Sequence, residues 1–159
     1  MCRKRLGWSL QVAAVDDVDA LLERYKLATA EFVLGNPEPY KGLFSHRQDV
    51  TLANPFFPGV RGWEGVSEAL ERTASRLRDG EFLGSEIVAK HVSEELACVV
   101  QLAHERAKVG ASEVLSSIDL RNTMVLRPEE GTWKIVHLHG DAITTPQPAE
   151  SVIQEQTYR

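Results

Sequence analysis

The chain has 159 residues, of which 43% are hydrophobic and 26% are charged, and its formal net charge is -5. This composition is typical of one globular domain, and the negative charge argues against nucleic acid or an anionic membrane as a partner. No stretch approaches the roughly 18 apolar residues of a membrane span. Residues 6–15 are interrupted by glycine, serine and glutamine, so we expect no secretory signal there. The two cysteines, Cys2 and Cys98, lie far apart, so we expect a reduced, cytoplasmic protein without a disulfide framework.

The first half of the sequence predicts helices. From Val18 to Val33, apolar residues recur at helical spacing, after a capping aspartate and before the terminating "GNPEP". Residues 40–44 indicate a short second helix, and residues 64–77 a third one. Between the second and third helices, "DVTLAN" predicts a short strand that ends before Pro55, whereas we expect "FFPGVRG" to be a loop.

After Gly80 the pattern changes to four β-rich segments, at residues 81–93, 96–109, 113–127 and 132–143. The joints between these segments are short, which favours antiparallel hairpins, and long strands in a small domain must twist. Helices followed by a run of strands predict an α+β fold in which three N-terminal helices pack in a strongly curved antiparallel sheet. We assign the domain to residues 16–143, between an N-terminal extension (1–15) and a polar C-terminal tail (144–159).

The expected sheet is apolar on both of its faces. In segments 96–109 and 113–127, apolar residues occupy odd and even positions alike. An antiparallel sheet with one face in water should alternate more cleanly, and the helices can cover only one face. We therefore predict a homodimer that forms through the outer sheet face.

Three helices, a short strand and a long curved meander resemble the nuclear transport factor 2-like superfamily, which includes ketosteroid isomerase, SnoaL-like polyketide cyclases, limonene epoxide hydrolase and a kinase association domain. The most specific match is "RNTMVLRPEEGTWKIVHLHGDAI", residues 121–143, which is similar to the end of SnoaL-like domains. "DVTLANPF" and "GVRGWEGV" are similar to the stretch before their third helix. The resemblance implies a cystatin-like α+β barrel, shaped as a cone with a pocket at one end.

For function, the resemblance implies a small-molecule pocket. One hypothesis is a cofactor-independent isomerase, cyclase or hydratase that uses general acid/base chemistry on a small apolar substrate. The alternative is a non-catalytic ligand-binding or assembly module, because this fold hosts both. In ketosteroid isomerase an aspartate base works with a tyrosine and a protonated aspartic acid that hold the oxyanion. Tyr25 and Tyr40 are candidates for that tyrosine by region, but the inward positions Val99, Gln101 and Ala103 offer no aspartic acid.

The candidate catalytic residues come mainly from "WKIVHLHGD", residues 133–141, where Trp133 is expected in the core. His137, His139 and Asp141 alternate along this segment and share one face of a strand. We predict that His139 and Asp141 lie near the cone, because the opposite face at Gly140 carries no reactive group. The structural alternative is that one histidine hydrogen-bonds a neighbouring strand and the other lines the pocket or a subunit contact. An HxH pair needs a third ligand to hold a metal, so we predict neither metal nor cofactor. Asp49, in an acidic and imidazole cluster near the expected pocket mouth, is the third catalytic candidate.

Five further side chains are expected to bind the ligand: Asn54, Trp63, Gln101, Arg121 and His137. Several of these have structural alternatives. Arg121 either binds a ligand anion with its planar fork or pairs with Glu105 across adjacent strands. A buried amide at Gln101 must find hydrogen bonds, either with a neighbour or in a wet pocket. Trp63 either covers the pocket mouth or packs in the core.

Overall fold

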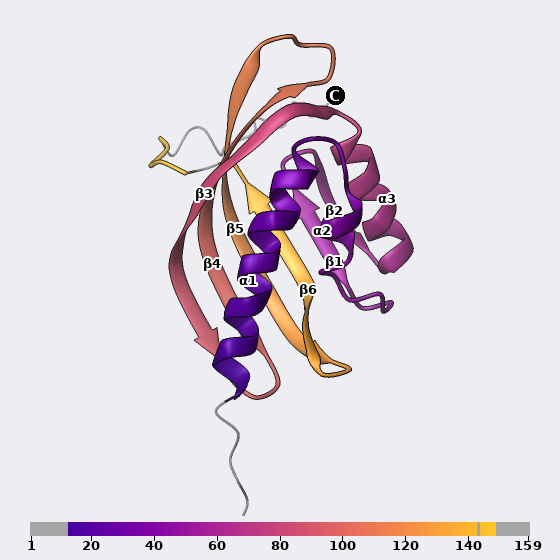
Figure 1. Cartoon of the computed structure of the whole chain (residues 1–159), viewed down its shortest axis with the longest axis vertical. Coiled ribbons are helices and arrows are strands. Elements are labelled where there is room, and N and C mark those ends of the chain that lie inside the picture. The colour runs from indigo at the N-terminus through magenta and orange to yellow at the C-terminus, as the bar shows by residue number, and fades with distance from the viewer. Residues whose placement is uncertain (1–12, 143, 149–159) are drawn as a thin grey trace, which may run out of the picture.

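The computed structural model describes residues 13–142 and 144–148. Figure 1 shows a long helix, α1 (Ala13–Phe32), lying across one face of a curved sheet, with α2 (Glu38–Lys41) and α3 (Trp63–Ala74) beside it. The strands are β1 (Thr51–Asn54), β2 (Phe57–Arg61), β3 (Leu77–Val92), β4 (Ala97–Val109), β5 (Leu115–Glu129) and β6 (Thr132–Asp141). Among the described residues, no helix is both long enough and apolar enough to cross a membrane.

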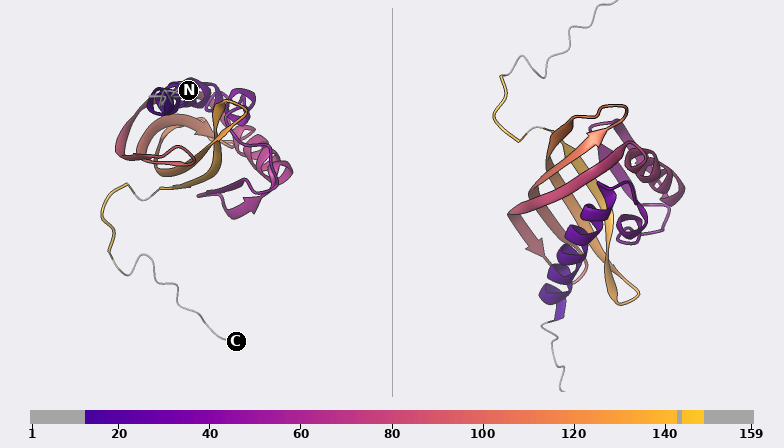
Figure 2. Two further views of the ribbon diagram at one scale, coloured as in Figure 1. Left: turned by 90° about the horizontal axis from the view of Figure 1, so that it is seen from below. Right: turned by 45° about the horizontal axis from the view of Figure 1, so that its top comes forward.

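The six strands form one sheet in the order β2-β1-β6-β5-β4-β3. Strands β3 to β6 form the expected antiparallel meander, and β1 joins it by parallel pairing with β6. Figure 2 shows the sheet curling toward α1, which confirms the predicted α+β class with a strongly curved sheet. The prediction of three N-terminal helices is confirmed only in part, because α2 has four residues and α3 follows two strands.

The expectation of a loop at "FFPGVRG" is wrong, because residues 57–61 form β2. This strand pairs with β1 only, with Leu52 opposite Val60 and Thr51 opposite Arg61. β2 lies at the edge of the sheet and has a hydrogen-bonded neighbour on one side only. Such a strand tolerates Pro58, which lacks a backbone N–H, better than a central strand would. The proline and glycine that suggest a loop are therefore compatible with pairing here.

The core lies between the helices and the concave face of the sheet. Val18, Leu21 and Tyr25 on α1 are buried, as is Phe44 after α2. Trp133 is also buried, at 4% exposure, which confirms its predicted place in the core. From β4, alternate residues from Ala97 to Ala107 point inward, so the period of the strand determines which side chains reach the helices.

A bulge in β6 changes which residues of that strand point inward. Val125 of β5 pairs with His137, and the next residue, Leu126, pairs with Ile135, so Val136 is an extra residue. Such a bulge shifts the inward–outward alternation by one position. Before the bulge Trp133 and Ile135 are buried, and after it Leu138 and Gly140 are buried. The histidines of β6 therefore belong to the outer face.

Candidate functional site

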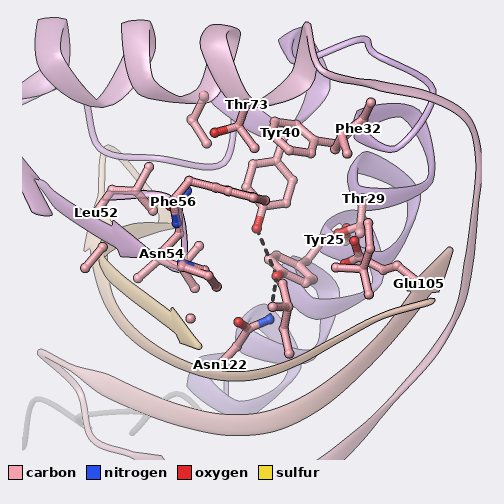
Figure 3. A pocket seen from close by; sticks show the side chains of 18 residues that line it. Tyr25, Thr29, Phe32, Tyr40, Leu52, Asn54, Phe56, Thr73, Glu105 and Asn122 are labelled. Atoms are coloured by element: carbon pink, nitrogen blue, oxygen red, sulfur yellow. Dashed lines mark hydrogen bonds between the residues drawn. The ribbon is translucent and has the colours of Figure 1, made fainter. Parts of the chain in front are cut away.

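A cavity opens between α1, α3 and the concave face of the sheet, with about 650 Å³ of empty space including its mouth. Figure 3 shows side chains from both the helices and the strands pointing into it. Most of the lining is apolar, including Phe32, Leu52, Phe56, Leu70, Leu77, Ile118, Leu120 and Leu138. The polar lining consists of Tyr25, Thr29, Tyr40, Asn54, Thr73, Glu105 and Asn122. A cavity with apolar walls and few polar groups suits a small, mostly apolar molecule.

Three of the polar side chains meet at the hydroxyl of Tyr25 (Figure 3). The Tyr40 hydroxyl donates to the Tyr25 oxygen at 2.9 Å, and the Asn122 Nδ2 donates to the same oxygen at 3.4 Å. Burial raises the pKa of both tyrosines, so they keep their protons at neutral pH. Because the Tyr25 oxygen already accepts two hydrogen bonds, its own proton is free to be donated to a third group.

Glu105 supplies the ionisable group of the cavity. It lies on β4 at an inward position, is 7% exposed, and makes no hydrogen bond or ion pair among the described residues. Burial raises the pKa of its carboxyl to about 7. A carboxyl with such a pKa can both accept and release a proton near neutral pH. Its partner across the ladder is Ile118, so it does not pair with Arg121.

Asn122 is positioned by its neighbours in the sheet. It faces Gln101 on β4 and Gly140 on β6. A Cβ atom at Gly140 would lie 2.6 Å from the Asn122 Oδ1, so only glycine leaves the amide its present place. Gln101 is buried beside it but is not part of the cavity lining, and its Nε2 has no partner in the part of the chain that the structure describes. Gly140 therefore helps to aim Asn122 at Tyr25.

Of the residues predicted from the sequence, Asn54 lies in the cavity wall. Its Oδ1 accepts the backbone N–H of Phe56 at 2.9 Å, which shapes the turn between β1 and β2. Trp63 does not reach the cavity and instead stacks on His46, with ring centroids 3.7 Å apart. Asp49 is exposed outside the cavity, where its Oδ2 accepts a hydrogen bond from Arg127 at 2.7 Å.

The prediction that His139 and Asp141 lie near the cone is wrong, because neither residue lines the cavity. His139 is exposed and Asp141 pairs with Arg121 at 2.8 Å, both on the outer face, because the bulge at Val136 reverses the alternation. His137 lies on the same face, where its Nδ1 and the Thr51 Oγ1 are 2.8 Å apart. Burial, and to a lesser degree His139, lowers the pKa of His137. Within the described ranges, His, Cys, Asp and Glu form no cluster of three that could hold a metal ion.

Sequence reasoning placed Tyr25 and Tyr40 correctly by region but missed Glu105 and Asn122. A signal for Glu105 was present, because inward positions recur every second residue of β4. Extending the inward series from Val99, Gln101 and Ala103 by one step reaches Glu105. Asn122 gave no such signal, because its role depends on contacts with α1 and Gly140 that only the folded chain brings together.

The family model for the SnoaL-like domain matches residues 18–144. The chain belongs to this family. A search of curated proteins finds no match. The part matched to the SnoaL-like domain runs through α1 to β6, so it contains Tyr25, Tyr40, Glu105 and Asn122.

Solved structures confirm the fold of the SnoaL-like domain. A ketosteroid isomerase-like protein from Erwinia carotovora atroseptica has a TM-score of 0.70 at 16% identity, over 85% of this chain and 100% of that chain. A nuclear transport factor 2-like protein from Streptomyces avermitilis, provisionally assigned as a dehydratase, has a TM-score of 0.68 at 15% identity, over 85% and 100%. A domain from Thiobacillus denitrificans, provisionally assigned as a calcium/calmodulin-dependent protein kinase type II association domain, has a TM-score of 0.60 at 14% identity, over 78% and 93%. At these identities the similarity establishes the fold alone.

Proposed function

We propose that this SnoaL-like domain is a cofactor-independent acid/base enzyme of the isomerase, cyclase or hydratase class. Its substrate is a small apolar molecule that carries a carbonyl group. The observation that carries the proposal is the carboxyl of Glu105, which has no hydrogen-bond or ion-pair partner among the described residues and shares a cavity with the hydroxyl of Tyr25. A buried ionisable group in a cleft, with a pKa moved toward neutrality, is typical of a catalytic acid or base.

The roles follow from the chemistry of the two groups. The Tyr25 hydroxyl donates a hydrogen bond to the substrate oxygen, and Tyr40 and Asn122 hold the phenol in position. The ionised Glu105 takes a proton from the carbon next to the carbonyl and returns it elsewhere, or in its protonated form gives a proton to a departing hydroxyl. The resemblance to ketosteroid isomerase would put a base near β1, but Asn54 at that place is an amide and cannot take a proton. Glu105 fills that role in the proposal.

Solvent exchange tests the proposal before any natural substrate is known. A panel of small cyclic ketones is incubated with the protein in deuterated water, and deuterium uptake next to the carbonyl is followed by NMR. General acid/base catalysis contributes on the order of 100-fold or more, so Glu105→Gln should lower the exchange rate by about that factor. Tyr25→Phe should lower it as well. Glu95→Gln, at an exposed carboxylate in the turn after β3, should leave the rate unchanged. Equal rates for Glu105→Gln and the unmodified protein would refute the assignment.

The second candidate is a ligand-binding or assembly module without turnover. The similarity to the provisionally assigned kinase association domain favours this candidate. It predicts ligand-induced NMR shifts around Tyr25 without any deuterium uptake, so the same experiment separates the two functions. A homodimer through the outer sheet face is compatible with either function, because the cavity opens on the other face.

A further inference from the structure

A second hollow adjoins the cavity. It is lined by Phe56, Phe57, Arg72, Thr73 and Arg76. Phe56 and Thr73 also line the cavity itself, so the two spaces meet along these side chains. Figure 3 shows Phe56 and Thr73 at the side of the cavity formed by the β1–β2 turn and α3. A ligand whose body fills the cavity would therefore reach the two arginines with its outer end.

Both arginines are exposed and have no acidic partner. Neither side chain makes a salt bridge or hydrogen bond among the residues that the structure describes. Several other arginines are paired: Arg78 lies 2.9 Å from Glu113, and Arg127 lies 2.7 Å from Asp49. Arg72 lies in the last turn of α3, Arg76 lies in the turn that follows this helix, and both line the same hollow. An anion in that hollow would therefore meet two positive charges.

We propose that Arg72 and Arg76 form a subsite that selects ligands carrying a carboxylate. A guanidinium presents a planar pair of N–H donors that matches the two oxygens of a carboxylate, and two such forks at the rim can hold one anion from both sides. Phe56 and Phe57 supply apolar walls next to the charges. The ligand is then amphiphilic: its neutral, reacting part lies at Tyr25 and Glu105, and its acidic part stays at the mouth. This subsite rests on the proposed function, since it uses the same cavity for the body of the ligand.

Matched pairs of an acid and its amide test the subsite directly. The probes are 3-phenylpropanoate, cyclohexylacetate and 2-naphthylacetate, each compared with its carboxamide, and binding is measured by ligand-observed NMR. The paired charges should make at least one acid bind about tenfold more tightly than its amide. The double variant Arg72→Gln/Arg76→Gln should bind acid and amide equally. The control is Arg24→Gln, at an exposed arginine on α1 that does not line either space, and it should keep the preference.

The outcomes separate this subsite from its alternatives. If the arginines only stabilise the end of α3 or contact another copy of the chain, the double variant changes the melting temperature or the light-scattering mass but keeps the acid preference, and the proposal is wrong. Absence of binding by every acid up to millimolar concentration also overturns it. Glu105→Gln should retain the acid preference, because it leaves the arginines in place. A retained preference together with lost deuterium exchange supports both assignments, whereas a retained preference with unchanged exchange supports the subsite and refutes the role of Glu105.

Discussion

The buried carboxyl of Glu105 gives a sharp prediction about stability and pH. An unfolded glutamate ionises at its ordinary pKa of 4.5, whereas the folded chain holds the proton until about pH 7, because burial disfavours the charge. The contribution of this group to stability is therefore fully present below pH 4.5 and is lost as the pH rises to about 7. The difference between the unfolded and folded pKa values corresponds to a decrease in the unfolding free energy on the order of 3 kcal/mol above pH 7. Glu105→Gln keeps the shape of the side chain but cannot ionise, so it does not suffer this loss.

Urea unfolding, with matched slopes, measures the effect. At about pH 4 the unfolding free energies of Glu105→Gln and the unmodified chain should be similar, and at about pH 8 the variant should be more stable by roughly 3 kcal/mol. Glu95→Gln is the control for loss of an exposed carboxylate. The difference in unfolding free energy between this variant and the unmodified chain should stay constant over the same pH range. A difference for Glu105→Gln that does not grow with pH would refute the reasoning. In that case the carboxyl is solvated or finds a partner, and its suitability as a base near neutrality is lost as well.

Other predictions concern packing and assembly. Gly140→Ala should destabilise the chain by roughly 1–3 kcal/mol and displace Asn122, which would alter the NMR shifts of the Asn122 amide. The control is Gly65→Ala, which should not destabilise the chain because the new Cβ would lie 3.7 Å from its nearest neighbour. Trp133→Ala should cost roughly 3–5 kcal/mol in urea unfolding, and an unchanged midpoint would mean that the ring is not core. Light scattering should give a dimer that Val100→Lys, at a half-buried position of the outer face, converts to a monomer; a monomeric unmodified chain at micromolar concentration would contradict the outer-face dimer.

Most of the fold could be predicted because it is encoded in local periodicity. The helical stripe from Val18 to Val33 and the β-rich run of residues 97–109 both depend on neighbours within a few positions. Short joints then leave the antiparallel meander as the simplest connection. β2 was not predicted because proline and glycine, here Pro58 and Gly59, are unfavourable in a central strand. The sequence alone does not reveal that this strand lies at the edge of the sheet.

The site was harder to predict because one inserted residue decides which face of β6 meets the cavity. The sequence "WKIVHLHGD" alternates without any visible interruption, so strict parity assigns His139 and Trp133 to the same face. Pairing with β5 makes Val136 a bulge, and the histidines then point outward. A bulge is set by how two strands register over their full length, which no local pattern in one of them reveals. The error therefore lies in the register and not in the strand assignment.

The concave face carries several unfavourable features in one place. In the part of the chain that the structure describes, Glu105 is buried with no hydrogen-bond or ion-pair partner, side chains do not close the cavity beside it, and position 140 is a glycine, which leaves room for the Asn122 amide. Each of these lowers stability, because a buried carboxyl without a partner and a gap in the packing are both unfavourable. An assembly module that uses only the outer face has no need for such a cavity. Natural chains retain local departures from good packing mainly where a ligand or a reaction requires them. These features favour the acid/base enzyme over the assembly module, and Glu105 is the position at which a substitution decides between them.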